Sequence, residues 1–429
     1  MLQTFRNAWK IEELRRKIIF TLFMVLLYRL GSAVLVPYVN TDALSAFFTA
    51  NLQTSILGLY NIMSGGAFSQ ATIFALSIQP YINASIIIQL LCIAIPALER
   101  LSKEGGEEGR KKINDITRYS TVAIALLQGY AYYVLISRNN LLVSNAPAVW
   151  AGIVIVLTFT AGSALLMWMG EQITEFGIGN GISIILFSSI VSRFPASVIR
   201  LIAQAVNHSL SWIATILMLL GALAIIVLII IVNDAERRIP VQYAKRVVGR
   251  KMYGGQSTHL PMKVNMSGVL PIIFAQAIAS LPSTVITLFG GNTDNWFSRT
   301  FNSSTIPYAI IYFLLIVFFS YFYSTIQFNP VEVANNLKKN GGFIPGYRPG
   351  KPTSEFIQKV LNKVTLFGAL YLGIIACVPI IISACSQAAA NTGISLGGTS
   401  IIIVVGVAIE TVQALENQML MRHYKGFLE

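Results

Sequence analysis

Few side chains in this sequence have the types and spacing that catalysis or metal binding requires. The three cysteines all lie inside apolar runs, which favours buried free thiols over disulfides. The three histidines are scattered along the chain and lack the spacing of a zinc site. The run that ends in Gly350, Lys351 and Pro352 is a near miss for a phosphate-binding loop, because proline stands where such loops carry serine or threonine. We therefore expect no enzymatic activity, no metal and no other cofactor.

Ionisable residues inside the apolar stretches are also scarce, and the main ones are Arg29 and Glu410. Transporters that couple solute movement to an ion gradient usually place acids, histidines or ion pairs in the middle of the membrane. Arg29 lies near one end of its stretch, where a long side chain can reach the interface, and Glu410 receives no predicted role. A secondary solute transporter therefore stays open as an alternative function, with weak support from these residues.

The composition indicates what kind of elements carry these residues. Hydrophobic residues make up 55% of the 429 and charged residues only 11%, with a mean hydropathy of +0.66. Average soluble domains contain about 25% charged residues, so this chain has too few ionic groups to cover a soluble globule. The formal net charge is +13. These values predict an all-α protein that crosses the membrane several times and carries basic aqueous loops.

Ten stretches are long enough for a helix to cross about 30 Å of hydrocarbon. Because ten is an even number, both termini lie on the same side of the membrane. The stretches run approximately over Ile18–Val36, Ala71–Ile95, Tyr119–Ile136, Val149–Met169, Ile178–Val191, Trp212–Val232, Gly268–Phe289, Ile306–Ile326, Leu366–Cys385 and Thr399–Met421.

The basic residues test this topology. When the loops are assigned alternately to two sides, 26 of the 31 basic residues fall on the side of the termini and 4 on the other. This asymmetry follows the positive-inside rule and predicts that both termini are cytoplasmic. A polar stretch near residues 195–210 suggests two halves of five spans each. An odd number of spans per half gives the halves opposite orientations, as in inverted-repeat transporters and channels.

The outer segment 37–70 contains a short apolar piece, residues 55–60, followed by NIMSGGAF. The piece is too short to cross the membrane and too apolar for water. A re-entrant half-helix in a protein-lined cavity fits this pattern, because irregular backbone survives at membrane depth only where protein or water shields it. An interfacial helix lying on the membrane surface also remains open from these residues.

Polar side chains punctuate the second and seventh predicted spans. Inside lipid such groups need hydrogen-bond partners, so they face protein or water. Ile78 and Ile82 are four residues apart and share one face of the second span. Ordinary helix packing explains these residues, and so does a wall that can open.

Two cytoplasmic loops, residues 234–267 and 327–365, are longer than a connection requires. The first is basic with interleaved tyrosines, and the second contains KKNGGFIPGYRPGKPTSEF. A solvated loop that only sets the orientation of the spans needs a few residues. We therefore expect both loops to dock a large acidic or phosphate-rich partner by electrostatic contact.

Several long strings of the sequence, spread from about residue 10 to residue 425, resemble a single family. On these strings the chain is similar to the SecY family, the channel subunits of the bacterial protein-export translocon. The resemblance implies ten transmembrane helices in two inverted five-helix halves around a central pore, with a re-entrant plug helix. The strings are MSGGAFSQATIFALSIQPYINASIIIQLL, EGRKKINDITRY, GEQITEFGIGNGISI, RRIPVQYAKR, QSTHLPMKVNMSGVLPIIFA, FNPVEVANNLKKNGGFIPGYRPGKPT, LFGALYLG and LGGTSIIIVV.

The resemblance also implies positions for the parts of the channel. The pore closes at an apolar ring, which resists water and ions by dewetting; by motif match its residues are Ile78, Ile82, Ile182, Leu186, Ile273 and Ile403. The plug spans about residues 57–68 and includes Leu57, Leu59, Tyr60, Ile62, Met63, Gly65, Gly66 and Phe68. The lateral gate, formed by the second and third spans against the seventh and eighth, receives Asn83, Gln89, Gln128 and Gln276. Basic positions for docking of the motor ATPase SecA or the ribosome are Arg238, Arg250, Lys251 and Arg348.

The function implied by the resemblance is a protein-conducting channel in the bacterial cytoplasmic membrane. It would move unfolded secretory polypeptides across the membrane and release hydrophobic segments sideways into lipid. The implied partners are SecE and SecG in a heterotrimer, SecA, the ribosome, signal sequences and unfolded preproteins, membrane lipid, SecDF and YidC. The expected domains are an N-terminal amphipathic segment (1–17), a first half (18–195), a second half (196–425) and a tail (426–429).

Overall fold

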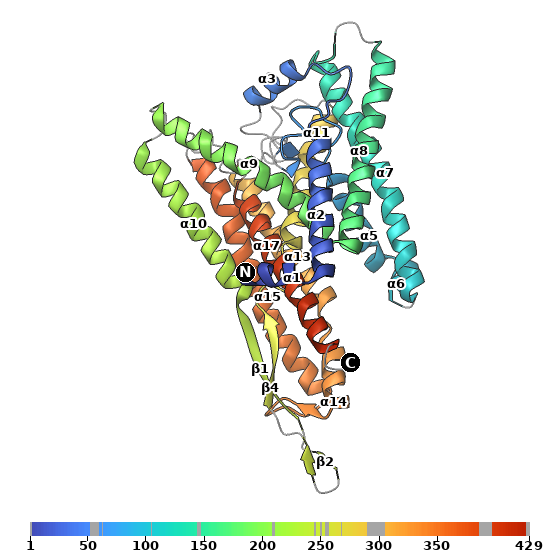
Figure 1. The fold of residues 1–429 in the computed structure, drawn as a ribbon, viewed down its shortest axis with the longest axis vertical. Helices are drawn as coiled ribbons and strands as arrows, with labels where there is room; N and C mark the ends of the chain where they lie inside the picture. The colour runs from blue at the N-terminus through green and yellow to red at the C-terminus, as the bar shows by residue number, and fades with distance from the viewer. Residues whose placement is uncertain are drawn as a thin grey trace.

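The structure is a computed structural model of the 429-residue chain, and long helices that run roughly side by side make up most of it (Figure 1). A β-hairpin projects from one end of the helices, and a short helix lies at the other end (Figure 1). The residues that the structure describes are 2–51, 60–61, 63–103, 105–143, 147–207, 211–243, 246–248, 251–253, 257–266, 268–289, 305–385 and 397–425.

Each predicted span coincides with a helix in the described part of the chain. Seven helices there are long and apolar enough to cross a membrane, or eight if one bent pair counts as a single span. The prediction of an all-α protein with many membrane spans is therefore confirmed. The ten helices that coincide with predicted spans are α2 (Glu12–Gly31), α5 (Gln79–Ala94), α7 (Gly106–Arg138), α8 (Ala148–Phe176), α9 (Gly181–Val206), α10 (Trp212–Asp234), α11 (Leu270–Phe289), α13 (Ile306–Gln327), α15 (Lys351–Cys385) and α17 (Gly397–Lys425).

The bent pair consists of α5 and α6 (Pro96–Lys103), whose axes differ by 105°. Ile95 lies between them in an extended conformation, with φ −107° and ψ 113°. Proline disfavours the helical conformation of the residue before it, because its ring collides with that residue's backbone. Pro96 therefore ends the span and turns the chain out of the helix bundle.

The second span begins later than its apolar pattern predicts. The pattern places a helix from Ala71, whereas α5 begins at Gln79 and residues 64–78 form a series of turns. Part of this segment pairs with residues 34–36, because Val36 N donates to Ala71 O and Ile73 N donates to Val34 O, both at 3.0 Å. The prediction for the first turns of this span is wrong, since a buried irregular segment is as apolar as a helix.

Helix α9 also differs from expectation. The fifth predicted span ends at Val191, but α9 continues through Pro195 to Val206. Its first turn is capped by Asn180, whose Oδ1 accepts hydrogen bonds from Ile182 N at 3.0 Å and Ser183 N at 3.4 Å. The polar residues near 195–206 therefore lie on the end of a helix rather than in a linker.

The two long loops fold together into one unit, which we call the platform (residues 236–263 and 330–361). Strand β1 (Glu236–Tyr243) pairs antiparallel with β4 (Ser257–Lys263) and, at its far end, with β5 (Gly342–Phe343). Strands β2 (Arg246–Val248) and β3 (Lys251–Tyr253) pair beyond them, at the tip of the hairpin in Figure 1. Helix α14 (Pro330–Lys339) and the first turns of α15 complete the platform, whose buried core is Ile239, Val241, Met262, Leu337, Ile344, Ile357 and Leu361.

Two further helices lie outside the spans. Helix α1 (Leu2–Lys10) contacts α2 and α17, and Ala8 of α1 is buried in a small cluster with Leu14 and Leu415. Helix α3 (Thr41–Asn51) lies at the end of the molecule opposite the hairpin (Figure 1). The largest apolar core, which we call the central core, joins residues of α2, α5, α8, α9, α10, α11, α13, α15 and α17.

Candidate functional site

The predicted ring residues all belong to, or pack against, the central core. Five of them are almost completely buried, and the sixth, Ile182, is partly buried and packs against the same core. They come from α5 and the residue before it, from α9, from α11 and from α17, so both ends of the chain contribute. The structure thus gathers aliphatic side chains from sequence-distant helices into one cluster. The buried five are Ile78, Ile82, Leu186, Ile273 and Ile403.

The described part of the predicted plug, which we call the plug base (residues 60–61 and 63–68), is held in tight turns. Gly66 N donates to Asn61 O at 2.8 Å, and Phe68 N donates to Ser64 Oγ at 3.0 Å. The first bond joins two backbone groups, and in the second a Ser side chain accepts from nearby backbone, as Ser commonly does. Gly65 and Gly66 have φ of +64° and +93°, a region that favours glycine. Leu57, Leu59 and Ile62 lie outside the described residues.

Two buried tyrosines attach the plug base to surrounding helices. Tyr28 of α2 shares a hydrogen bond with Ser189 Oγ of α9 at 2.6 Å, and its hydroxyl is 3.4 Å from Ser64 O. Tyr132 of α7 donates to Phe68 O, and the two rings stack with centroids 4.4 Å apart. The sequence analysis missed both tyrosines. The one feature of the sequence that could have indicated them is a tyrosine inside an apolar span, because its hydroxyl needs a hydrogen-bond partner there.

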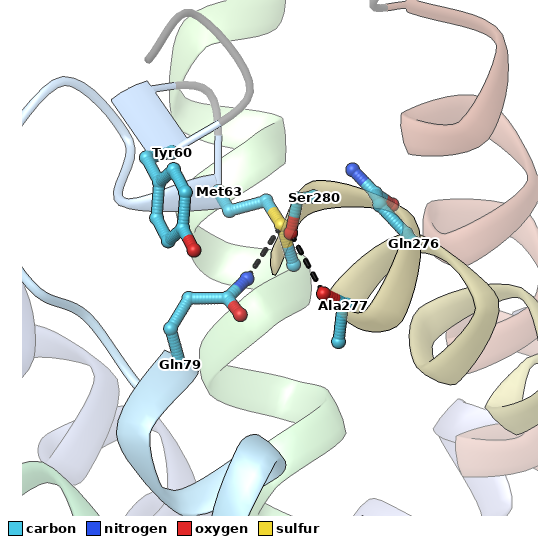
Figure 2. Close-up of a pocket in the computed structure, with 6 residues that line it drawn as sticks. All are labelled: Tyr60, Met63, Gln79, Gln276, Ala277 and Ser280. Carbon is cyan, nitrogen blue, oxygen red and sulfur yellow. Dashed lines mark hydrogen bonds between the residues drawn. The ribbon is translucent and has the colours of Figure 1, made fainter. Parts of the chain in front are cut away.

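A small, partly open pocket lies between the plug base, the start of α5 and α11 (Figure 2). On one side Gln79 Nε2 donates to Met63 Sδ at 2.7 Å, and on the other Ser280 Oγ donates to Ala277 O at 2.8 Å. Figure 2 shows the side chains of both sides around this space. Polar groups of the plug base, α5 and α11 thus meet where the second and seventh spans approach each other. The lining residues are Tyr60, Met63, Gln79, Gln276, Ala277 and Ser280.

The helices predicted to form the lateral gate are neighbours. Both α5 and α7 contact α11, and α13 packs on α11. Tyr323 of α13 donates a hydrogen bond to Gln89 Oε1 of α5, while Gln89 Nε2 donates to Ser85 Oγ at 3.1 Å. The Tyr323 ring also lies 4.9 Å from that of Phe274 on α11. Tyr323, which the sequence analysis missed, therefore connects both sides of this seam.

The other predicted gate residues lie on α5, α7 and α11, and the described residues show no hydrogen bond between any two of them. Asn83 of α5 is 9% exposed and Gln276 of α11 is 5% exposed. The amide oxygens of Gln128 and Gln276 are buried and have no hydrogen-bond partner among the described residues. Gln276 lines the pocket beside Gln79 of α5, and among the predicted gate residues in the described part of the chain Gln89 has a hydrogen bond across the seam.

The predicted docking residues that the structure describes lie on the platform. Arg238 on β1 is exposed, with its Nε 3.7 Å from the carboxylate of Glu236. Arg348 is also exposed, and its carbonyl accepts a hydrogen bond from Thr353 Oγ1 at 2.8 Å. Lys251 belongs to β3, and Arg250 lies outside the described residues. No cluster of His, Cys, Asp and Glu in the described ranges could hold a metal ion.

Comparison with known proteins gives a consistent assignment. The model of the SecY family matches residues 72–412. A protein translocase subunit SecY of Streptomyces scabiei is 45% identical over 442 aligned residues, which cover 100% of both chains. A structure on the plug domain of SecY, which stabilises the closed state of the translocation channel and maintains a membrane seal, has the same fold with a TM-score of 0.63. Sec61 in the canine ribosome–channel complex from the endoplasmic reticulum also has a TM-score of 0.63.

Both structures are 16% identical to this chain, and each alignment covers 94% of this chain and 92% of the other. At that identity the structural likeness establishes the fold alone. The family model and the relative from Streptomyces scabiei, in contrast, extend over most or all of the sequence. The chain belongs to the SecY family.

Proposed function

We propose that this protein is the channel subunit of a protein translocon. It moves unfolded secretory polypeptides across the bacterial cytoplasmic membrane and releases hydrophobic segments sideways into lipid. The observation that carries the proposal is the aliphatic cluster of ring residues, which comes from helices of both halves and lies in the same core as Met63 of the plug base. A closed cluster of flexible aliphatic side chains excludes water and ions, and it can part around a chain of any sequence.

The other parts of the site have roles in the same mechanism. The plug base, attached through Tyr28 and Tyr132, backs the closed ring on one side. The seam between α5 and α7 on one side and α11 and α13 on the other is the lateral gate, where Asn83, Gln89, Gln128 and Gln276 supply polar contacts. When a hydrophobic segment enters the seam, its apolar side chains replace aliphatic contacts and leave through the gap into lipid.

The platform is the docking surface in this proposal. Its side of the membrane is cytoplasmic, as are both termini, in agreement with the concentration of basic residues there. Arg238, Arg250, Lys251 and Arg348 attract the acidic or phosphate-rich surface of SecA or the ribosome. SecE and SecG complete the channel as a heterotrimer, and SecDF and YidC act beside it. SecA or the translating ribosome supplies the driving energy.

The test is crosslinking of a stalled secretory precursor to the pore. Single cysteines replace Ile82 on α5 and Ile273 on α11 in a chain from which the native cysteines have been removed, and a cysteine at Leu217 of α10, which is 70% exposed, serves as the control. We expect the precursor to crosslink to the cysteines at 82 and 273 and not to the one at 217. Export without contact at the first two positions would refute the pore path and favour a solute transporter or another route.

A further inference from the structure

Strand β4 of the platform ends at Lys263 and α11 of the gate begins at Leu270, and between them the structure describes residues 264–266 and 268–269. Val264 N donates to Ala235 O at 3.0 Å, which extends the β1–β4 ladder by one more bond. Met266 packs against the platform core, whereas Val269 is buried in the central core. The connection, which we call the link, is therefore part of both cores.

Two side-chain hydrogen bonds fasten this region to helices on either side. Lys263 Nζ donates to Gln413 Oε1 of α17 at 2.6 Å. Asn265 Nδ2 donates to Asn233 Oδ1 at the end of α10 at 2.9 Å. The last residue of β4 is thus bonded to α17, and Asn265 of the link is bonded to α10.

Glycines on neighbouring helices allow the link to lie against their backbones. A Cβ atom at Gly368 of α15 would be 2.6 Å from Val264 O, and one at Gly406 of α17 would be 2.7 Å from Val269 Cγ1. Real Cβ atoms essentially never approach other heavy atoms so closely, so these contacts exist only because both residues lack a side chain. Val264 and Val269 of the link thus lie in close contact with α15 and α17, respectively.

Glu410 of α17 contacts the link at Gly268. Gly268, which turns the chain into α11, has φ +62°, and a Cβ atom there would be 2.5 Å from Glu410 Oε1. The carboxylate therefore lies directly against the turn before the first residue of α11. A negative charge is favourable at that place, because the N-terminus of a helix carries a partial positive charge.

We propose that the link is a clamped connection through which a partner docked on the platform moves α11, and that Glu410 and Gln413 are positioning residues that keep it stiff. The proposal rests on the channel function proposed above. The partner presents a large acidic or phosphate-rich surface to the basic platform. Because the link cannot bend freely between its two cores, a shift of the hairpin reaches the start of α11 and changes the contact of α11 with α5 and α7.

The test compares α17 variants in reconstituted vesicles, with SecA as the docking partner. In Glu410→Ala with Gln413→Ala we expect SecA-driven transport to fall about 5-fold or more, while SecA affinity and resting ion leak stay within about 2-fold of the parent. Glu410→Gln keeps the contact with Gly268 and should retain most of the transport. Thr411→Ala is the matched control on α17, because the Thr411 hydroxyl bonds to Val407 O of its own helix at 2.7 Å.

A distance measurement separates positioning from a general structural effect. Spin labels at Leu127 of α7 and Leu281 of α11, which are 70% and 44% exposed, report the width of the gate. We expect SecA to widen the gate in the parent and in Thr411→Ala, but not in the double alanine variant. Widening equal to that of the parent, at intact SecA affinity, would overturn the proposal.

Two further outcomes are decisive. If the double variant does not assemble, the single variants are used, and transport at the parent rate in both of them would overturn the proposal. Gly268→Ala should lose transport through its clash with Glu410, and adding Glu410→Ala should restore part of it; purely additive losses would contradict the contact. A parent channel that transports no precursor would instead refute the channel function itself.

Discussion

Replacing Tyr323 by phenylalanine removes a single hydroxyl from the seam between α13 and α5. In the structure this hydroxyl donates to Gln89 Oε1, while the other end of the amide donates to Ser85 Oγ. The phenylalanine ring keeps the packing against Phe274, whose centroid lies 4.9 Å away. The substitution therefore deletes one polar contact across the gate and leaves the apolar contacts in place.

The size of the effect follows from that contact. A protein hydrogen bond contributes about 0.5–1.5 kcal/mol net, and leaving its acceptor buried without a donor costs about 1–3 kcal/mol. In the open gate Gln89 and Tyr323 separate and can bond to water or to the passing chain, so the loss falls on the closed state. We estimate a destabilisation of the closed gate of about 1–2 kcal/mol, which raises the open-to-closed ratio by about 5- to 30-fold.

Single-channel recording in planar bilayers measures this ratio directly as the open fraction. The matched control is Tyr321→Phe, because Tyr321 lies two residues earlier on α13 and its hydroxyl donates to Asn362 O of α15 at 3.3 Å, on the same side of the seam. We expect the control to change the open fraction by less than about 2-fold. An unchanged open fraction in Tyr323→Phe, or an equal increase in both variants, would refute the assignment of this bond to the gate.

Three other substitutions test the platform and the packing of the irregular segment. Arg348→Glu should slow SecA association about 3- to 10-fold at low salt and much less at high salt, as measured by stopped-flow fluorescence, because exposed charges are screened; equal rates at both salts would contradict docking there. Gly162→Ala puts a Cβ 2.0 Å from Ile73 O and should cost about 1–3 kcal/mol or more, whereas Gly221→Ala meets nothing within 4 Å and should gain about 0.5–1 kcal/mol. Melting temperatures of the two variants in detergent measure this difference, and similar values would speak against the close approach.

Hydropathy predicts most of the fold because lipid leaves the backbone little choice. A segment surrounded by hydrocarbon must satisfy its N–H and C=O groups internally, so an apolar stretch of sufficient length becomes a helix. Residues 64–78 escape this rule because protein surrounds them, as the contact between Gly162 and Ile73 O illustrates. Residues 71–78 are as apolar as the start of a span, so their composition does not distinguish the two environments.

The tyrosine contacts could not be predicted for a different reason. Tyr28 bonds to a residue 161 positions away, and Tyr323 to one 234 positions away. Such pairs depend on how the helices are arranged, and a tyrosine in an apolar run indicates only that some partner exists. The prediction of the ring residues comes from the family resemblance, because their spacing does not differ from that of ordinary helix packing.

The platform shows how local pattern and charge give different information. Net charge predicts a basic docking surface on the two long loops, but it says nothing of their folding. In β1, buried Ile239 and Val241 alternate with exposed neighbours, which is the pattern of a strand with one buried face. The alternation is only a few residues long and includes Pro240, so the sequence alone does not predict a strand. The structure shows one because β4 and β5 pair with it.

The seam and the link differ in how firmly they are held, and the difference suits a gate. The seam carries the Tyr323–Gln89 bond together with apolar contacts, so a bound segment that contributes a few kcal/mol of differential affinity is enough to shift its equilibrium. The link is bonded to Asn233 through Asn265, Gln413 holds Lys263 directly before it, and glycines of α15 and α17 lie against it. If the link were as weakly held as the seam, movement of the platform would be lost in bending before it reached α11. A stiff connection beside a weak seam lets docking at one end open the gate at the other.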